Sequence, residues 1–366
     1  MKILIGMPAA DSRGGPINCE PPFVAALREA GVEVDEEVYV YGDGGTPVDA
    51  VTRIKRVVDA ARRLKHRVRE NSYDLVHLNT SFDARCLVRD SLALRAIGGR
   101  VPVFLKMHGS IAAFLATRNR VWAAAQRRLF HQVAGIGVLS TEEMRRFIDA
   151  GCDQRKLVIV KNAIEPLGQG SAGRDLTGDR GIARDCPLLL FSSRLMPAKG
   201  LLDVINGCKI LRERNREFSL IVLGDGPQRA EAENLVRSAG LERHVRFTGY
   251  LTEVEASAYH VQAALFIFPS YHDEGLPMVL LKSLSAGLPI ITTRIRAAAD
   301  YLTEPDNCLW VDPKSPVDVA EKIQTLLDAP ALARKMSENN RRLAGEFSPA
   351  EVAAEYIALY RGIIAK

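Results

Sequence analysis

Short apolar segments alternate with longer amphipathic segments along almost the whole chain. The apolar segments are rich in valine, isoleucine and leucine and mostly lack a regular alternation with polar residues. Because helices cover both faces of a parallel sheet, such segments predict buried parallel strands. The predicted strands are 2–8, 32–41, 74–80, 101–109, 135–139 and 156–164, followed by 187–194, 218–226, 244–250, 264–270, 289–293 and 308–312.

Amphipathic segments between these strands have the spacing of helices. Clear examples are 21–31, 53–71, 140–151, 200–215 and 315–329, and the chain finishes with a helix over 348–366 that starts with Ser-Pro. Regular alternation of strand and helix predicts an α/β fold with two Rossmann-like, doubly wound parallel sheets.

Residues 165–186 interrupt this pattern with five glycines, mixed charge and few bulky apolar residues. A stretch of this composition is typical of a loop between domains. We therefore divide the 366 residues into a first domain, 1–170, and a second domain, 171–366. The final helix, 348–366, can pack back on the first domain.

The composition excludes several classes of protein. With 47% hydrophobic and 25% charged residues, the chain is neither disordered nor fibrous, and no apolar stretch approaches the ~20 residues of a membrane-spanning helix. The first residues are interpreted as a buried strand rather than a signal peptide. The six cysteines are scattered without a CxxC pair, so we expect no zinc site, no disulfide framework and a cytoplasmic location.

The net charge of +5 comes from the first domain. Residues 51–70 contain eight lysines or arginines and two acids, and residues 91–130 contain seven and no acid. A basic first domain suggests a face that meets an anionic partner, and basic helices at 51–70 and 114–130 suit an anionic membrane surface. Solvated helix faces are the alternative explanation, and with 6% aromatic residues and no binding motif we expect no nucleic-acid partner.

Two clusters in the second domain can carry chemistry. Arg194 and Lys199 lie in the loop between a strand and a helix, where two cations and free backbone amides can bind a diphosphate. Glu274 and Gly275 follow the strand 264–270 and open a helix, so a carboxylate there can accept hydrogen bonds from hydroxyls. Taken singly, Arg194 and Lys199 are better explained as solvated surface charges, and Glu274 has the alternative explanation of a helix cap.

Together the clusters resemble the retaining glycosyltransferases of family 4, which have the GT-B fold of two Rossmann-like domains. Arg194 and Lys199 are followed by Glu-Gly-Leu-Pro at 274–277 and by a helix that ends in Ala-Gly-Leu-Pro-Ile. Further segments keep the family's order along the chain: Gly14-Gly15, the residues around His108, the turn at Asn162, Gly224–Pro227 and Gly249-Tyr250.

The resemblance implies a sugar transfer from a nucleotide-diphosphate sugar to a glycan, lipid-linked or small-molecule acceptor, with retention of configuration and without a metal or other cofactor. It assigns catalytic roles to Arg194, Lys199, Glu274 and His108. Donor binding falls to Gly15, Gly249, Tyr250, Gly275, Leu276, Pro277 and Lys282, and the acceptor side to Gly14, Asn79 and Ser110. Polysaccharide or glycoconjugate assembly is the expected context.

One position departs from the family's pattern. The family has a second glutamate eight residues after the first, which holds the ribose hydroxyls, and this chain has Lys282 there. A lysine cannot accept those hydrogen bonds. Either the ribose is held otherwise, or donor binding is weak, or the chain is a catalytically silent GT-B protein that acts as a binding partner or scaffold.

A dinucleotide-dependent oxidoreductase is the rival enzyme class. It requires GxGxxG after an early strand. The glycine-rich segment that comes nearest, GDGPQR, has Arg229 where the last glycine or alanine belongs. The sequence therefore argues against this class.

Overall fold

The computed structural model describes residues 1–9, 15–39, 49–167, 186–272 and 275–366. The chain divides into two compact units. The first contains residues up to Glu165 together with 275–278 and Phe347–Lys366, and the second contains the described parts of Pro166–His272 and Val279–Glu346. The predicted domain boundary at residue 170 lies outside the described residues.

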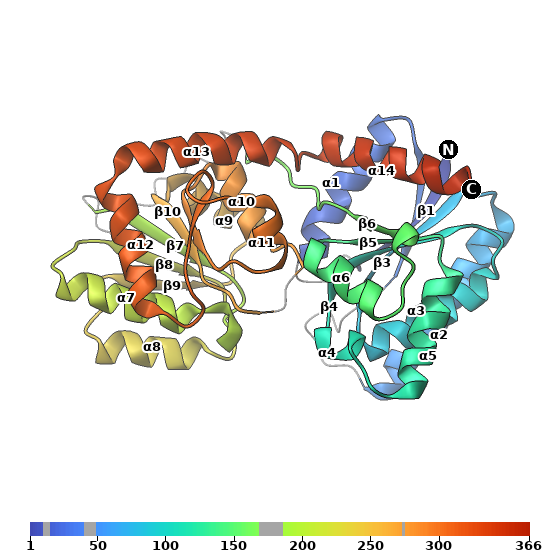
Figure 1. The fold of residues 1–366 in the computed structure, drawn as a ribbon, viewed down its shortest axis with the longest axis horizontal. Coiled ribbons are helices and arrows are strands. Elements are labelled where there is room, and N and C mark those ends of the chain that lie inside the picture. Colours follow the sequence, from blue (N-terminus) through green and yellow to red (C-terminus); the bar gives the residue numbers. More distant parts are fainter. Residues whose placement is uncertain (10–14, 40–48, 168–185, 273–274) are drawn as a thin grey trace. The chain divides into compact units, whose positions relative to one another are not determined.

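The first unit is built on a six-stranded parallel sheet with strand order β2-β1-β3-β4-β5-β6 (Figure 1). Its strands are β1 (Lys2–Met7), β2 (Glu33–Val38), β3 (Leu75–Phe82), β4 (Val103–Ser110), β5 (Gly135–Val138) and β6 (Leu157–Ile159). Its helices are α1 (Gly15–Glu29), α2 (Ala50–Glu70), α3 (Ala84–Ile97), α4 (Ala112–Leu115), α5 (Arg120–Gln132), α6 (Thr141–Asp149) and α14 (Pro349–Ile364), with a 3-10 turn η1 (Gln154–Lys156).

The second unit repeats the architecture with strand order β12-β11-β10-β7-β8-β9. Its strands are β7 (Leu188–Ser192), β8 (Ser219–Leu223), β9 (Val245–Gly249), β10 (Leu265–Phe268), β11 (Ile290–Thr292) and β12 (Cys308–Trp310). The helices are α7 (Leu201–Glu213), α8 (Arg229–Ser238), α9 (Glu253–Gln262), α10 (Met278–Ala286), α11 (Arg296–Tyr301), α12 (Pro316–Asp328) and α13 (Pro330–Gly345), with a 3-10 turn η3 (Pro197–Lys199).

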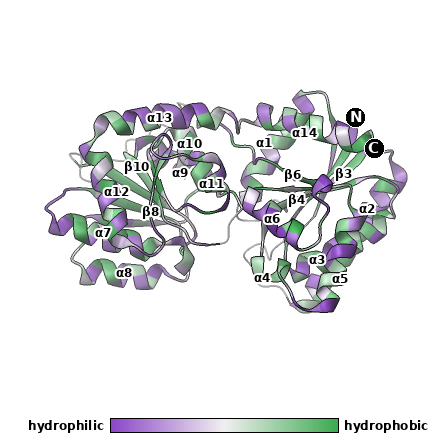
Figure 2. Cartoon of the chain, in the orientation of Figure 1, coloured by the Kyte–Doolittle hydropathy of each residue, from purple (hydrophilic) through white to green (hydrophobic). Residues whose placement is uncertain are grey.

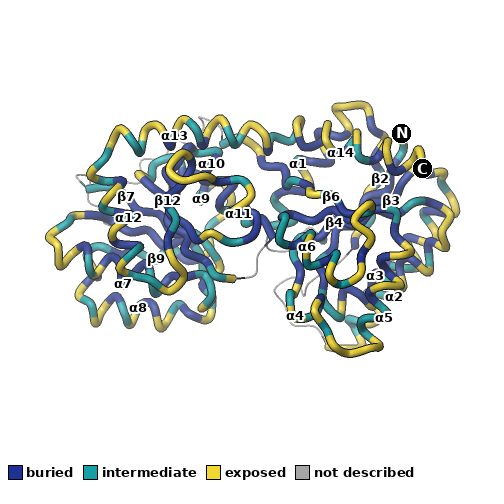
Figure 3. The backbone as a smooth tube through the Cα atoms, viewed as in Figure 1, coloured by how far each residue is buried: buried dark blue, intermediate teal, exposed yellow. Residues whose placement is uncertain are grey.

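The two sheets confirm the predicted doubly wound α/β fold. The central strands are buried along their length, as continuous apolar segments require, and the helices carry one apolar and one polar face (Figures 2 and 3). The predicted strand 156–164 is too long, because only Leu157–Ile159 is a strand in the sheet. The edge strand β2 also differs from the central ones, since three of its positions are exposed, the charged residues Glu33 and Glu36 and the apolar Val38.

The last helix, α14, belongs to the first unit and packs against α1. Ser348 caps it by accepting a hydrogen bond from the Glu351 amide, and Pro349 is its first residue, as the Ser-Pro start predicts. Tyr356 and Tyr360 of α14 join a buried aromatic cluster that includes Phe23 of α1. The end of the chain thus completes the core of the unit in which the chain begins.

Candidate functional site

The carboxyl ends of the strands in the second unit form one edge of its sheet. From β7 the sheet continues through β8 and β9 on one side and through β10, β11 and β12 on the other. The strand order therefore reverses between β7 and β10, and ligands of open α/β sheets bind at such a switch point. Residues 193–200, which follow β7, lie at this position.

The loop after β7 carries the two predicted cationic residues. Arg194 is exposed, and Lys199 is half-buried with its Nζ 5.8 Å from the centroid of the Phe268 ring. Lys199 ends the turn η3, and Gly200 then forms the N-cap of α7. Two cations beside the unsatisfied amides of a helix N-terminus suit a phosphorylated ligand.

The loop after β8 holds this cationic loop in place. The Leu195 amide donates to the Asp225 carbonyl (3.0 Å), and the Gln228 amide donates to the Leu195 carbonyl (3.0 Å). A Cβ atom at Gly226 would lie 2.4 Å from the Leu195 carbonyl oxygen. Only glycine permits so close an approach of the two backbones, which explains the Gly-Asp-Gly-Pro segment and fixes the position of Arg194.

Gly249 and Tyr250 lie at the carboxyl end of the neighbouring strand β9. The carbonyl of Gly249 accepts a hydrogen bond of 3.0 Å from the Gly224 amide in the loop after β8. Tyr250 is 58% exposed, so its ring can stack on a planar ligand group. The fold thus gathers Arg194, Lys199, Gly249 and Tyr250 along one edge of a single sheet.

Lys282 lies on α10 and is largely buried, with 13% of its side chain exposed. Its ammonium forms an ion pair with Glu253, the first residue of α9, whose side chain is 51% exposed. Burial lowers the pKa of Lys282 to about 8, so the ammonium is still mostly charged at neutral pH. Lys282, at the position where the resemblance implies a second glutamate, thus pairs with a carboxylate from another helix.

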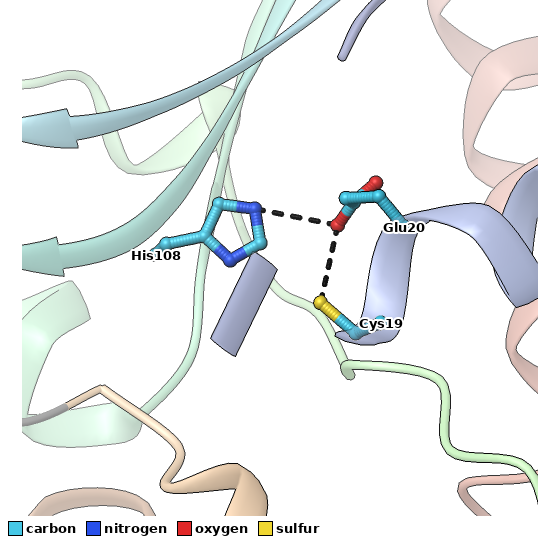
Figure 4. Close-up of side chains that lie close together, drawn as sticks. All are labelled: Cys19, Glu20 and His108. Atoms are coloured by element: carbon cyan, nitrogen blue, oxygen red, sulfur yellow. Dashed lines mark hydrogen bonds and ion pairs between the residues drawn. The ribbon is translucent and has the colours of Figure 1, made fainter. Parts of the chain in front are cut away.

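The first unit contains a buried ionic network between α1 and the end of β4 (Figure 4). Its centre is Oε1 of Glu20, which lies 2.7 Å from the Lys106 ammonium and 3.3 Å from His108 Nε2, and which accepts from Cys19 Sγ at 3.5 Å. Burial raises the pKa of Glu20, but the charge of Lys106 and the hydrogen bond with His108 outweigh this and hold the pKa well below its ordinary value. Glu20 is therefore a carboxylate.

The hydrogen bonds of Asn79 determine which nitrogen of His108 carries the proton. The Asn79 amide nitrogen donates to the Gly6 carbonyl (3.1 Å) and to Glu20 Oε2 (3.0 Å), which uses both of its hydrogens. Its oxygen, 2.9 Å from His108 Nε2, must accept. Burial lowers the pKa of His108 below its ordinary value, so the ring is neutral, with a proton on Nε2 and a lone pair on Nδ1.

Cys19, Glu20 and His108 offer three potential metal-ligand atoms within 4.8 Å of one another. The chemistry of the group does not suit a metal ion. The Lys106 ammonium already lies on the carboxylate oxygen, His108 Nε2 carries a proton, and burial raises the pKa of Cys19 well above its ordinary value. We interpret the group as an ion-pair network that orients His108.

Residues 275–278 fall in the first unit and lie against the end of β4. A Cβ atom at Gly275 would be 3.0 Å from the His108 carbonyl oxygen and 2.7 Å from Leu139 Cδ1. A Cβ atom at Gly15 would be 3.2 Å from Met278 Cγ. The segment 275–278 therefore lies beside both Gly15 and His108, so that three predicted site residues are neighbours: Gly15, His108 and Gly275.

The remaining predicted residues fall into three groups. Gly14 and Glu274 lie outside the described residues. Leu276 is buried and Pro277 half-buried beside Gly275. Asn79 and Ser110, predicted for the acceptor side, are both buried, and the Ser110 hydroxyl donates to Glu143; their contact with an acceptor stays a prediction.

Three charged residues of the candidate site do not appear among the predictions: Glu20, Lys106 and Glu253. Lys106 offers a signal, because it is the one charged residue within the apolar segment 103–107. Its partner Glu20 lies 86 positions earlier, so the pairing becomes visible only in the folded chain. Glu253 resembles any acid in the first turn of a helix.

Comparison with known proteins gives the family of the chain. Residues 175–343 match the family model of glycosyl transferases group 1, and residues 22–166 match glycosyltransferase family 4. The chain is 26% identical over 307 residues to the 2-deoxystreptamine glucosyltransferase of Streptomyces kanamyceticus. This alignment covers 80% of this chain and 78% of that protein.

Solved structures share the fold over the full length. The Thermosynechococcus elongatus sucrose-phosphate synthase superposes with a TM-score of 0.77 at 20% identity, covering 100% of this chain and 99% of that one. Anabaena HepE in complex with UDP gives a TM-score of 0.75 at 16% identity, covering 99% and 100%. The chain therefore belongs to the family 4 type of glycosyltransferase with the GT-B fold.

Proposed function

We propose that this glycosyltransferase transfers a sugar from a nucleotide-diphosphate sugar to a hydroxyl group of a small-molecule, glycan or lipid-linked acceptor, with retention of configuration and without a metal. The observation that carries this proposal is the loop after β7. There Arg194 and Lys199 precede the N-terminus of α7 at the switch point of the second sheet. Glycosyl-acceptor chemistry is supported by the similarity to a 2-deoxystreptamine glucosyltransferase.

In the proposed mechanism, Arg194 and Lys199 hold the diphosphate and neutralise the charge that develops on the leaving nucleotide. Fixed cations in a partly dehydrated site stabilise such charge as a metal ion would. The sugar passes through an oxocarbenium-like transition state, and an oxygen of the departing phosphate takes the proton of the acceptor hydroxyl. The resemblance to family 4 further assigns contact with the sugar to His108 and to the backbone of residues 275–277.

Nucleotide binding tests the proposal directly. Thermal shift and calorimetry with UDP, GDP and ADP should reveal one preferred nucleotide, and UDP comes first because a similar structure contains it. Arg194→Ala removes a charge-assisted contact of about 1.5–3 kcal/mol, so affinity should fall about tenfold to a hundredfold. Arg334→Ala, on an exposed position of α13, is the matched control and should change nothing.

Product analysis tests the stereochemistry. Turnover of the preferred nucleotide-sugar should give a product whose anomeric configuration, read by NMR coupling constants, is that of the donor, and added EDTA should leave the rate unchanged. Inversion would refute the retaining mechanism, and inhibition by EDTA would refute metal independence. Nucleotide binding without any turnover or hydrolysis would favour a silent binding partner, and no nucleotide binding would refute the donor site.

We further propose that the first unit lies on an anionic membrane when the acceptor is lipid-linked. On this unit α2 packs against α3 and α3 packs against α5, and α2 and α5 carry the basic stretches (Figure 3). Val51 and Ile54 of α2 and Val121 of α5 are exposed apolar residues among these cations. Such a surface suits peripheral binding to anionic headgroups. Among the described residues, no helix combines the length and apolar character needed to cross a bilayer.

Vesicle sedimentation tests this surface. Binding to vesicles with about 30% phosphatidylserine should exceed binding to pure phosphatidylcholine and weaken with salt, since each nearby cation contributes about 1 kcal/mol. Reversing Arg62, Lys65 and Arg69 to glutamate should abolish the difference. Reversal of Arg237, on α8 of the second unit, is the control. Equal binding to both vesicles would refute membrane docking.

A further inference from the structure

The ion pair between Lys282 and Glu253 joins two helices of the second unit. Lys282 comes from α10, which follows β10, and Glu253 begins α9, which follows β9. The side chain of Lys282 is 13% exposed, whereas that of Glu253 is 51% exposed. The lysine is therefore the buried partner, and the carboxylate is the partner that solvent can reach.

Glu253 lies on the same sheet edge as the cationic loop. Backbone hydrogen bonds connect the loops along this edge: the Tyr271 amide donates to the Ala198 carbonyl (2.9 Å), the Leu195 amide to the Asp225 carbonyl (3.0 Å), and the Gly224 amide to the Gly249 carbonyl (3.0 Å). Glu253 follows Gly249 by four positions. The chain of contacts thus runs from the end of β10 through the cations to the start of α9.

The charges on this edge determine which part of a nucleotide each residue can meet. Arg194 and Lys199 attract the diphosphate, whereas the carboxylate of Glu253 would repel it. A carboxylate only accepts hydrogen bonds, so its partner must be a hydroxyl or an amine. A nucleoside diphosphate presents base, ribose and diphosphate in that order, and its two neighbouring ribose hydroxyls are the donors nearest to the phosphates.

The aromatic ring of Tyr250 suits the base, which is the end of the nucleotide away from the phosphates. Tyr250 precedes Glu253 by three positions and is 58% exposed. The sheet edge therefore offers an aromatic group, a carboxylate and two cations to a ligand that contains a planar base, a diol and a diphosphate. Lys282 pairs with Oε1 of Glu253 and so fixes the direction of the carboxylate.

We propose that Glu253, oriented by Lys282, accepts hydrogen bonds from the ribose hydroxyls of the bound nucleoside diphosphate. The carboxylate that the family's second glutamate would supply from α10 comes here from α9, and Lys282 is its positioning residue. This inference rests on the proposed function, because it requires a nucleotide at Arg194 and Lys199.

Paired ribose and deoxyribose ligands test the assignment. Calorimetry would compare UDP, or whichever nucleoside diphosphate the enzyme prefers, with its 2′-deoxy analogue. A charge-assisted hydrogen bond corresponds to about a tenfold to hundredfold preference for the ribonucleotide. In Glu253→Ala we expect this preference to fall to about twofold or less, whereas Glu338→Ala, an exposed acid on α13, should retain it in full.

Two further measurements separate ribose binding from a merely structural role. Inorganic pyrophosphate lacks ribose, so Glu253→Ala should bind it at least as well as the wild type, while Arg194→Ala should not. The double variant Glu253→Lys/Lys282→Glu preserves the ion pair but moves the carboxylate to α10. It should restore a ribonucleotide preference of at least about fivefold, within the range that one such hydrogen bond supplies.

The outcomes distinguish the inference from the proposed function. If the wild type binds the nucleotide through Arg194 but Glu253→Ala keeps the full preference for ribose, the inference is wrong and the donor site stands. If the wild type itself shows no ribose preference, the inference is also wrong. If no nucleoside diphosphate binds, both fail. If Glu253→Ala weakens pyrophosphate as much as nucleotide, its effect is structural and the ribose contact is refuted.

Discussion

Replacing Lys106 by methionine would leave a buried carboxylate without its cation. Lys106 is fully buried, and its ammonium lies 2.7 Å from Oε1 of Glu20, which is also fully buried. Methionine keeps most of the side-chain volume, so packing changes little. Breaking one side of a buried ion pair costs about 3–5 kcal/mol. We expect the free energy of unfolding of the first unit to fall by this amount.

Urea unfolding followed by tryptophan fluorescence measures the loss. The chain has two tryptophans, Trp122 in the first unit and Trp310 in the second, so a Trp310→Phe background isolates the signal of the first. With a slope of about 2 kcal/mol per molar urea, the midpoint should move down by roughly 1.5–2.5 M. Lys65→Met, the same change on an exposed position of α2, should cost less than about 0.5 kcal/mol.

The pH dependence provides the decisive check. In the wild type the pKa of Glu20 is below its unfolded value, so its stabilising contribution is complete above about pH 4.3 and is lost as the pH falls through the folded pKa. Without Lys106, burial raises the pKa of Glu20, and the variant gains stability relative to the wild type as the pH falls. The difference between the two proteins should therefore shrink from pH 7 to pH 5.

A loss below about 1 kcal/mol, or one that is equal at pH 7 and pH 5, would refute this reasoning. The double variant Glu20→Gln/Lys106→Met should recover a large part of the loss at pH 7, because it removes the uncompensated charge. Recovery is the expected signature of an ion pair rather than of a packing defect.

Three other predictions concern single groups. Tyr360→Phe removes the hydroxyl that lies 2.5 Å from His77 Nδ1, and should cost about 1–3 kcal/mol in the same unfolding assay. Gly226→Ala places a Cβ 2.4 Å from the Leu195 carbonyl oxygen, so the loop that carries Arg194 must either move or be strained by about 1–3 kcal/mol. If that cost falls on the nucleotide-binding conformation, affinity measured by calorimetry should weaken about fivefold or more. NMR of nitrogen-labelled histidine should show His108 neutral, with its proton on Nε2, at pH 7.5, because burial lowers the pKa of the ring.

Each of these has a clear contrary result. A Tyr360→Phe protein as stable as the wild type would mean that the buried hydrogen bond contributes nothing. Unchanged affinity in Gly226→Ala would show that the contact between the two loops does not position Arg194, with Gly345→Ala, where a Cβ meets open space, as control. An imidazolium signal from His108 at pH 7.5 would contradict the lowered pKa of the buried ring, and a neutral ring with its proton on Nδ1 would contradict the hydrogen bond to Asn79.

The candidate site was predictable where local chemistry marks it. Arg194 and Lys199 lie between a strand and a helix, and that position follows from hydrophobic pattern alone. The ion pair of Lys282 was not predictable, because its identity shows only that a carboxylate is missing from this position of α10. Its partner lies 29 positions earlier on another helix, so that only the folded chain reveals the pair.

The alternation of buried strands and amphipathic helices determined the α/β architecture, because hydrophobic period and strand length are local properties of the chain. The cationic loop after β7 was determined in the same way. Only the tertiary structure decided that Glu20, Asn79 and Lys106 surround His108 and fix its proton, that residues 275–278 lie against β4, and that α14 completes the first unit. These contacts join residues far apart in the sequence. They form only in the folded chain, where burial removes water from the charged groups and each charge must be stabilised by its partner.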